Sequence, residues 1–117
     1  MEKTDVVTAL AALAQDNRLD VFRLLVQAGR DGMAAGDIAE RLKLAPNTLS
    51  FHFDRLRNAG LISVRRDGRS MIYAALYENM NALLSFLTDN CCKGAPESCV
   101  PAACSPARTA KRKKVPA

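Results

Sequence analysis

The sequence predicts a small α+β fold that is mainly α-helical and carries one two-stranded β-hairpin. Apolar residues recur at helical spacing over most of the first 90 residues, and two short helices meet at a tight turn near residue 45. Two β-rich segments then flank the Asp67-Gly68 pair, which is a strong hairpin signal. A chain of 117 residues with 49% hydrophobic residues has room for one compact domain with tails.

Two helices are expected to precede the tight turn. A first helix near the N-terminus is indicated by apolar residues at helical spacing: Val6, Leu10 and Leu13. Asp16 or Asn17 is expected to cap the second helix, which ends at Gly29. Apolar side chains cover most of the circumference of that second helix: Leu19, Val21, Phe22, Leu24, Leu25 and Val26. We therefore expect it to be the buried centre of the domain.

The next two helices are joined very closely. The segment 36–43 is helical in pattern, and a fourth helix begins at Pro46, a residue favoured in the first helical turn. Only Leu44 and Ala45 lie between them. Two short helices joined in this way are typical of a helix-turn-helix, in which the second helix enters the major groove of DNA.

The fourth helix divides into an apolar side and an outward side. Leu49, Phe53 and Leu56 fall together, with His52 beside them. The outward residues are short and mostly polar: Asn47, Ser50, Phe51, Asp54, Arg55 and Asn58. This face is suited to contacts with base edges, and Phe51 is suited to a thymine methyl group, although the alternative for Phe51 is ordinary packing.

The β-rich segments 61–66 and 69–75 predict a hairpin that follows this helix, so the fold class is a winged helix-turn-helix. Its tip gathers Arg65, Arg66 and Arg69, which can reach phosphates or a minor groove, or can be plain surface charges. A last helix over 76–90 carries an apolar stripe suited to the first helix or to a second subunit: Leu76, Met80, Leu83, Leu84 and Leu87.

Charge supports a nucleic-acid partner for the middle of the chain. The net charge is +5, and residues 41–69 alone hold seven basic and two acidic groups. No apolar segment approaches the roughly 20 residues of a membrane span, and the first residues do not resemble a secretory signal. We therefore expect a cytoplasmic protein without a membrane partner.

Composition changes after Asn90. We expect three parts: a DNA-binding and dimerisation domain over 1–90, a cysteine-rich segment over 91–104, and a basic disordered tail over 105–117. The tail is expected to attract phosphates weakly and without specificity. All four cysteines lie in the middle part, and in a reducing compartment such a cluster indicates a site rather than disulfides.

From about Leu10 to Asn90 the chain resembles the ArsR-type (ArsR/SmtB) winged-helix metalloregulators. The resemblance rests on LAQDNRLDVFRLL, on GDIAERLKLAPNTLSFHFDRLRNAGLISVRRDGRSMIYAA, and most specifically on Ser50-x-His52-Phe53 and the AGLI turn. It implies a homodimeric repressor that leaves its operator when thiophilic metalloids or soft metals bind, and it favours a DNA contact for His52 over a partly buried histidine. Together with the pattern it predicts these DNA-binding residues: Asn47, Thr48, Ser50, Phe51, His52, Arg55, Arg65, Arg66 and Arg69.

The inducer site expected from the cysteines is a trithiolate. The family's cysteine pair before the recognition helix is missing, because 33–43 contains no cysteine. Cys91 and Cys92 are adjacent, and a short loop leads from them to Cys99. The three thiolates can together complete the coordination shell of As(III), a soft, three-coordinate centre. The NCCxGxxxSC pattern also resembles the arsenic-responsive subset of the family. We expect no cofactor in the DNA-bound form and As(III) as the inducer.

Other thiol chemistry stays open at this point. Zinc is disfavoured because Cys91 and Cys92 are adjacent, whereas structural zinc sites space their pairs by two to four residues. Cadmium, antimonite and trivalent organoarsenicals are alternative inducers, and a redox switch is an alternative mechanism. A small thiol enzyme such as an arsenate reductase is the alternative from a different class. It is disfavoured because there is no histidine near the cysteines that would activate a nucleophile.

Overall fold

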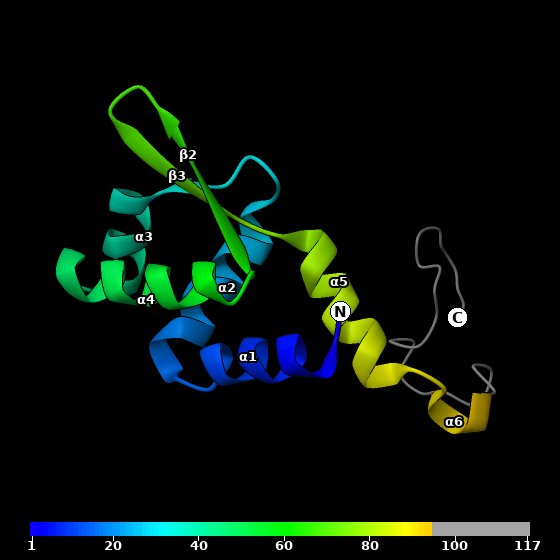
Figure 1. Cartoon of the computed structure of the whole chain (residues 1–117). Coiled ribbons are helices and arrows are strands. Elements are labelled where there is room, and N and C mark those ends of the chain that lie inside the picture. Colours follow the sequence, from blue (N-terminus) through cyan, green and yellow to red (C-terminus); the bar gives the residue numbers. More distant parts are fainter. Residues whose placement is uncertain (95–117) are drawn as a thin grey trace. The chain divides into compact units, whose positions relative to one another are not determined.

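The computed structural model describes residues 1–94 of the chain (Figure 1). In chain order the elements are α1 (Lys3–Leu13), α2 (Asp16–Ala28), β1 (Met33–Ala34), α3 (Ala35–Leu42), α4 (Pro46–Asn58), β2 (Ile62–Asp67), β3 (Ser70–Ala75), α5 (Tyr77–Thr88) and α6 (Cys91–Gly94). The predicted class, a mainly helical fold with a hairpin wing, is confirmed. Within these residues, no helix is long and apolar enough to cross a membrane.

The chain forms two compact units, of which the first is Met1–Leu83 and the second begins at Leu84. The boundary between these units therefore falls inside α5. The first unit holds the helix-turn-helix and the hairpin, and the described part of the second unit holds the end of α5 and α6.

The core of the first unit is centred on one side of α2. Val21 and Leu25 are fully buried, and Phe22 is nearly so. The expectation that α2 lies at the centre of the core is confirmed, since Leu24 and Val26 also pack against it, but Leu19 is 43% exposed. The expected cap is wrong, since the Gln15 side chain accepts the first-turn hydrogen bond, from the backbone N–H of Arg18 at 2.9 Å. The side-chain oxygen of Gln can cap a helix in the same way as the oxygen of the shorter Asp or Asn side chain.

The tight turn between α3 and α4 has the expected form. Lys43 takes a left-handed conformation with φ of 56°, and the N–H of Leu44 donates to the carbonyl of Ala39 at 3.1 Å. This geometry ends α3 within one residue. Pro46 then occupies the first turn of α4, as its fixed φ favours. The turn places α4 against the core through buried Leu49, Phe53 and Leu56.

The wing is a three-stranded sheet, and Figure 1 shows its β2–β3 hairpin extending away from the helices of the first unit. Asp67 pairs with Ser70, so the two-residue loop is Gly68-Arg69 and lies one residue later than predicted. Gly68 has φ of 63°, which this loop requires. The short strand β1 pairs with β3 on its other side and was not predicted, because two residues carry no alternation.

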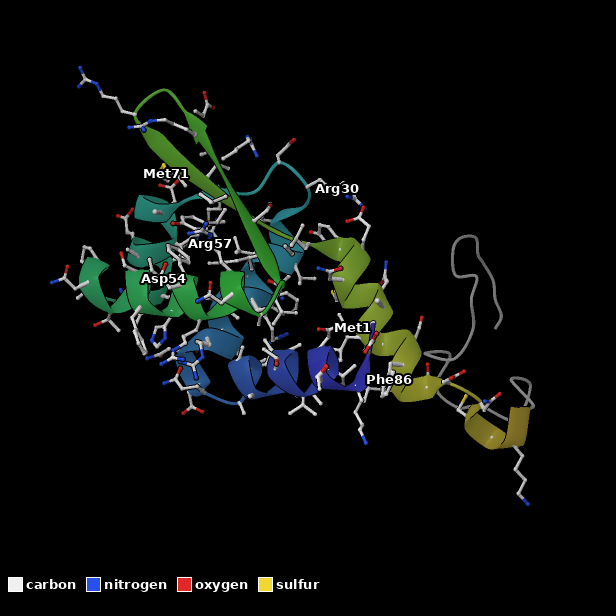
Figure 2. The ribbon with its side chains drawn as sticks, viewed as in Figure 1. Met1, Arg30, Asp54, Arg57, Met71 and Phe86 are labelled. Carbon is white, nitrogen blue, oxygen red and sulfur yellow. The ribbon has the colours of Figure 1, made fainter. Side chains whose placement is uncertain are left out.

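The start of α5 is tied to α2 and α4. The hydroxyl of Tyr77 donates to the carbonyl of Val26 at 2.7 Å, and the side-chain amide of Asn79 donates to the carbonyl of Gly60 at 2.7 Å. Arg30 lies beside the start of α5 (Figure 2) and forms an ion pair with Glu78 at 3.1 Å. These contacts fix the first turns of α5 on the helix-turn-helix.

Candidate functional site

The outward face of α4 is the centre of the candidate DNA interface. Five of the residues predicted there are exposed: Asn47, Thr48, Ser50, Phe51 and Arg55. The Arg55 guanidinium lies 5.0 Å from the centre of the Phe51 ring, which is 51% exposed. The face therefore offers amide and hydroxyl groups at its start and a cation over an aromatic ring one turn later, which are groups that can contact base edges and phosphates.

His52 does not belong to this exposed face. It is only 5% exposed, so its side chain cannot reach a base edge, and the DNA contact favoured by the resemblance is wrong. Both ring nitrogens are buried without a hydrogen-bond partner in the described part of the chain, so the single hydrogen bond of the alternative interpretation is also missing. Burial lowers the pKa of His52, and the nearby positive charge of Arg18 lowers it further.

The wing arginines have different roles. Arg65 donates from Nη2 to the carbonyl of Asp31 at 3.1 Å, which ties β2 to the turn before β1. Arg66 donates from Nε to the carbonyl of Gly68 at 3.3 Å and so curls over the hairpin loop. Arg69 lies in that loop and is exposed. Their spare N–H groups remain available to phosphates.

Arg18 was not expected near the recognition helix. Its Nε donates to the carbonyl of Ala12 at 2.6 Å, and its side chain lines the same groove as Phe51 and Arg55 of α4. Spacing along the sequence gave no signal for this placement, because α2 and α4 are brought together by the fold. In the sequence alone, Arg18 looks like an ordinary surface arginine in the first turn of a helix.

The first two predicted arsenic ligands are neighbours at the start of α6. Neither is in a disulfide, Cys91 is half-buried and Cys92 is exposed. Partial burial raises the pKa of the Cys91 thiol, and the charge of Cys92 and a hydrogen bond between the two side chains raise it further. Cys92 and Lys93 have left-handed backbone angles, so α6 is a turn rather than a regular helix.

The third predicted ligand, Cys99, lies outside the described residues, as does Cys104. Within residues 1–94, no group of three or more His, Cys, Asp or Glu side chains is placed to hold a metal ion. The described cysteines therefore supply two thiols adjacent in the chain, and thiols are the kind of soft donor that a thiophilic centre prefers.

Comparison with known proteins agrees with this geometry. A helix-turn-helix domain family matches residues 13–65, which run from the end of α1 through α4 and into the wing. The transcriptional regulator YgaV of Escherichia coli is 30% identical over 71% of this chain and 82% of its own length. The ArsR-like transcriptional regulator of Rhodococcus sp. RHA1 aligns with a TM-score of 0.64 and 26% identity, over 72% of this chain and 76% of its own. The chain belongs to the ArsR-like helix-turn-helix transcriptional regulators.

Two further relatives extend the comparison of this ArsR-like chain. YceK of Bacillus subtilis, an HTH-type transcriptional regulator, is 35% identical over 58% of this chain and 66% of its own length, just under two thirds. A homodimeric winged helix-turn-helix DNA-binding domain from Mycobacterium bovis aligns with a TM-score of 0.60 and 26% identity, over 79% of this chain and 85% of its own.

Proposed function

We propose that this ArsR-like protein is a repressor that binds operator DNA as a homodimer and releases it when arsenite binds to Cys91, Cys92 and Cys99. DNA binding is carried by one observation: the exposed face of α4 presents amide, hydroxyl and guanidinium groups while its other face is held in the core. Asn47 and Ser50 supply contacts to base edges, and Arg55 and the wing arginines supply contacts to phosphates.

The homodimer is supported by apolar side chains on the surface of both units. In the first unit, Val7 and Leu10 of α1 are 59% and 42% exposed. In the second unit, Leu84 and Leu87 of α5 are 52% and 54% exposed. Water-exposed leucines on two helices favour burial against a second copy, and the Mycobacterium bovis relative is described as homodimeric.

Arsenite fits the chemistry of the cysteine pair. Each thiol that binds gives up its proton and displaces one hydroxide from arsenic as water, so one As–O bond is replaced by one As–S bond. Three thiols complete the shell of As(III), and Cys91 and Cys92 supply two of them from adjacent positions of the chain. The raised pKa of Cys91 keeps this thiol protonated at neutral pH, so the proton that it gives up leaves with the displaced hydroxide as water.

We expect α5 to couple arsenite binding at the cysteines to DNA binding by α4. Its start is hydrogen-bonded to the segment that ends α4, through Asn79 and Gly60, and the same helix leads in sequence to Cys91. A change at the cysteines that alters α5 therefore has a covalent and hydrogen-bonded route to the recognition helix. The coupling must be reciprocal, so operator DNA is expected to weaken arsenite binding by the same factor.

A gel shift of operator DNA titrated with arsenite tests the proposal. The wild-type protein is expected to release DNA, whereas Cys91→Ser, Cys92→Ser and Cys99→Ser bind the operator normally and fail to release it. Cys104→Ser is the matched control and is expected to respond as the wild type does. A full arsenite response in the Cys99→Ser protein, or none in the Cys104→Ser protein, contradicts the three-thiolate site.

The same titration separates the competing mechanisms. Release by peroxide that is reversed by a reductant indicates a redox switch, and release by zinc that requires Cys104 indicates a tetrahedral site. Response to a trivalent methylarsenical after loss of Cys99 indicates a two-thiol inducer. Absence of operator binding in every condition contradicts the DNA-binding proposal itself.

A further inference from the structure

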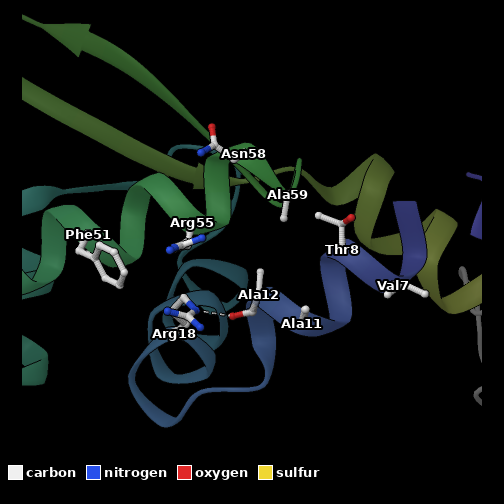
Figure 3. Close-up of a pocket in the computed structure, with 9 residues that line it drawn as sticks. All are labelled: Val7, Thr8, Ala11, Ala12, Arg18, Phe51, Arg55, Asn58 and Ala59. Atoms are coloured by element: carbon white, nitrogen blue, oxygen red, sulfur yellow. Dashed lines mark hydrogen bonds between the residues drawn. The ribbon is translucent and has the colours of Figure 1, made fainter. Parts of the chain in front are cut away.

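Arg18 lies beside the recognition helix although it belongs to another element. It is in the first turn of α2, and it lines one groove together with three residues from the outward face of α4: Phe51, Arg55 and Asn58. Figure 3 shows the side chains of Arg18 and Arg55 facing each other across this groove. The surface around α4 therefore continues onto the start of α2.

The two arginines of this groove have no charged partner among the described residues. Arg18 and Arg55 form no ion pair within residues 1–94, and no carboxylate is among the residues of that range that line the groove. The charge of Arg18 also lowers the pKa of buried His52, after the larger effect of burial. Two like charges beside one groove repel each other, and an anion placed between them removes this repulsion. This edge of α4 is therefore suited to an anion.

Both guanidinium groups are held in place by contacts inside the protein. The Nε of Arg18 donates to the carbonyl of Ala12 at 2.6 Å, which leaves its two terminal nitrogens without a hydrogen-bond acceptor in residues 1–94. The Arg55 guanidinium lies 5.0 Å from the centre of the Phe51 ring. Because an arginine fixed in this way loses little side-chain entropy on binding, its remaining N–H groups are favourable donors to a phosphate oxygen.

The position of Arg18 relative to α4 favours a phosphate over a base edge. The major groove of DNA is about 12 Å wide and a helix with its side chains is about 10 to 12 Å across, so a helix fills the groove. An element beside that helix then faces the phosphate backbone. Figure 1 shows the β2–β3 hairpin on one side of α4 and the junction between α1 and α2 on the other. Arginines therefore flank the recognition helix on both sides.

We propose that Arg18 binds a phosphate of the DNA backbone together with Arg55, on the side of α4 opposite the wing. This contact rests on the proposed DNA-binding function and adds to it a residue of α2, which precedes the helix-turn-helix. It needs only the α4 side of the groove, so it is compatible with a second copy that covers Val7 of α1. The contact carries no sequence preference, because the phosphates are the same at every base pair.

The salt dependence of DNA binding by the full-length, reduced protein tests this contact. Fluorescence anisotropy is measured with an operator duplex and with a random-sequence duplex of the same length, at several salt concentrations. Arg18→Gln keeps a donor for the Ala12 carbonyl but loses the charge, and it is expected to weaken binding to both duplexes about tenfold at low salt. The slope of log affinity against log salt should become shallower by about 1 for each chain that binds DNA, which gives about 2 for a homodimer.

Two further variants separate a phosphate contact from a structural role. Arg18→Lys keeps the positive charge without the Nε donor, and it should keep the wild-type slope. Arg23→Gln removes the same charge from an exposed position of α2 outside the groove, and it should leave both affinity and slope near their wild-type values. Urea unfolding of all three proteins shows that each is folded when tested.

Chemical modification gives a measurement that needs no variant. Phenylglyoxal reacts with accessible guanidinium groups, and mass spectrometry identifies the arginines that have been modified. Random-sequence DNA at low salt should slow the modification of Arg18 in the wild-type protein and leave that of Arg23 unchanged. An equal rate at Arg18 with and without bound DNA contradicts the contact.

Three results from the variants also overturn it. One is a folded Arg18→Gln protein with the affinity and salt slope of the wild type, as expected if a second copy covers Arg18. Another is an equal loss of slope in the Arg18→Gln and Arg18→Lys proteins, which assigns Arg18 a structural role. The third is a weakening confined to the operator duplex, which indicates a base contact. Absence of DNA binding by the wild-type protein contradicts the proposed function itself, so the two failures are distinguishable.

Discussion

The two faces of α4 share one backbone and have opposite constraints. The inner face packs Leu49, Phe53 and Leu56 at no more than 3% exposure, and the Phe53 ring stacks on Tyr73 at 3.7 Å between ring centres. The outer face is polar and exposed, and in residues 1–94 its only ion pair joins Asp54 to Arg57 at 3.9 Å. The inner face fixes where the helix lies. Residues of the outer face can therefore serve DNA recognition while contributing little to the stability of the fold.

The largest effect is expected from the inner face. Leu56→Ala removes a fully buried side chain and is expected to lower the free energy of unfolding by about 2 to 5 kcal/mol, measured by urea denaturation. Arg57→Ala, its exposed neighbour, is the control and should change stability by less than about 0.5 kcal/mol. Equal effects from the two variants would mean that the two faces are not separated as described.

A smaller effect, on DNA alone, is expected from the outer face. Asn47→Ala and Ser50→Ala should each weaken operator binding by about 1 to 3 kcal/mol, because each substitution removes a base contact, and the urea midpoints should not change. Affinity for random DNA should change little, because base contacts carry the sequence preference. Unchanged operator affinity in a protein that carries both Asn47→Ala and Ser50→Ala shows that α4 presents another face to DNA.

His52 gives a pH test of the inner face. Burial depresses its pKa in the folded state below the ordinary 6.5, so the unfolded chain binds a proton that the folded chain excludes. Stability is therefore full above pH 6.5 and falls as the pH drops below it. His52 is the chain's only histidine, so His52→Leu should remove this slope between pH 7.5 and 5. A persistent slope in the variant assigns the effect to other groups.

The smallest effect is expected in the wing. Arg69→Ala should lower affinity for operator and random DNA alike, and the slope of the salt dependence should become shallower by about 1 for each phosphate that the variant no longer neutralises. Arg65→Ala should additionally lower stability slightly, because Arg65 also holds the Asp31 carbonyl. Binding at several salt concentrations and urea unfolding together separate the two residues. Identical behaviour would indicate that the Asp31 contact has no structural role.

The sequence was informative where one residue type imposes a local geometry. Pro46, Gly29 and Gly68 marked the start of α4, the end of α2 and the hairpin loop, because fixed or positive φ angles leave few alternatives. The polar face of α4 was predictable for a similar reason, since helical periodicity separates the two faces.

Tertiary neighbours were not predictable in the same way. His52 lies at the edge of the apolar stripe, and only the packing of the helices decides whether it is buried. The position of Arg18 beside α4 and the pairing of β1 with β3 both join segments far apart in sequence. Spacing along one element carries no information on such contacts, and the resemblance suggested the opposite outcome for His52.

The pairing of β1 with β3 also has a consequence for how the chain folds. Met33 pairs with Tyr73 forty residues later, and α3, α4 and β2 all lie within the loop that this pairing closes. A Cβ at Gly32 would collide with the Tyr73 carbonyl, so the junction tolerates only glycine there. Contacts this distant in sequence are entropically costly to close and form late. During synthesis, Phe53 of the recognition helix is therefore expected to lack its stacking partner Tyr73 until β3 has left the ribosome.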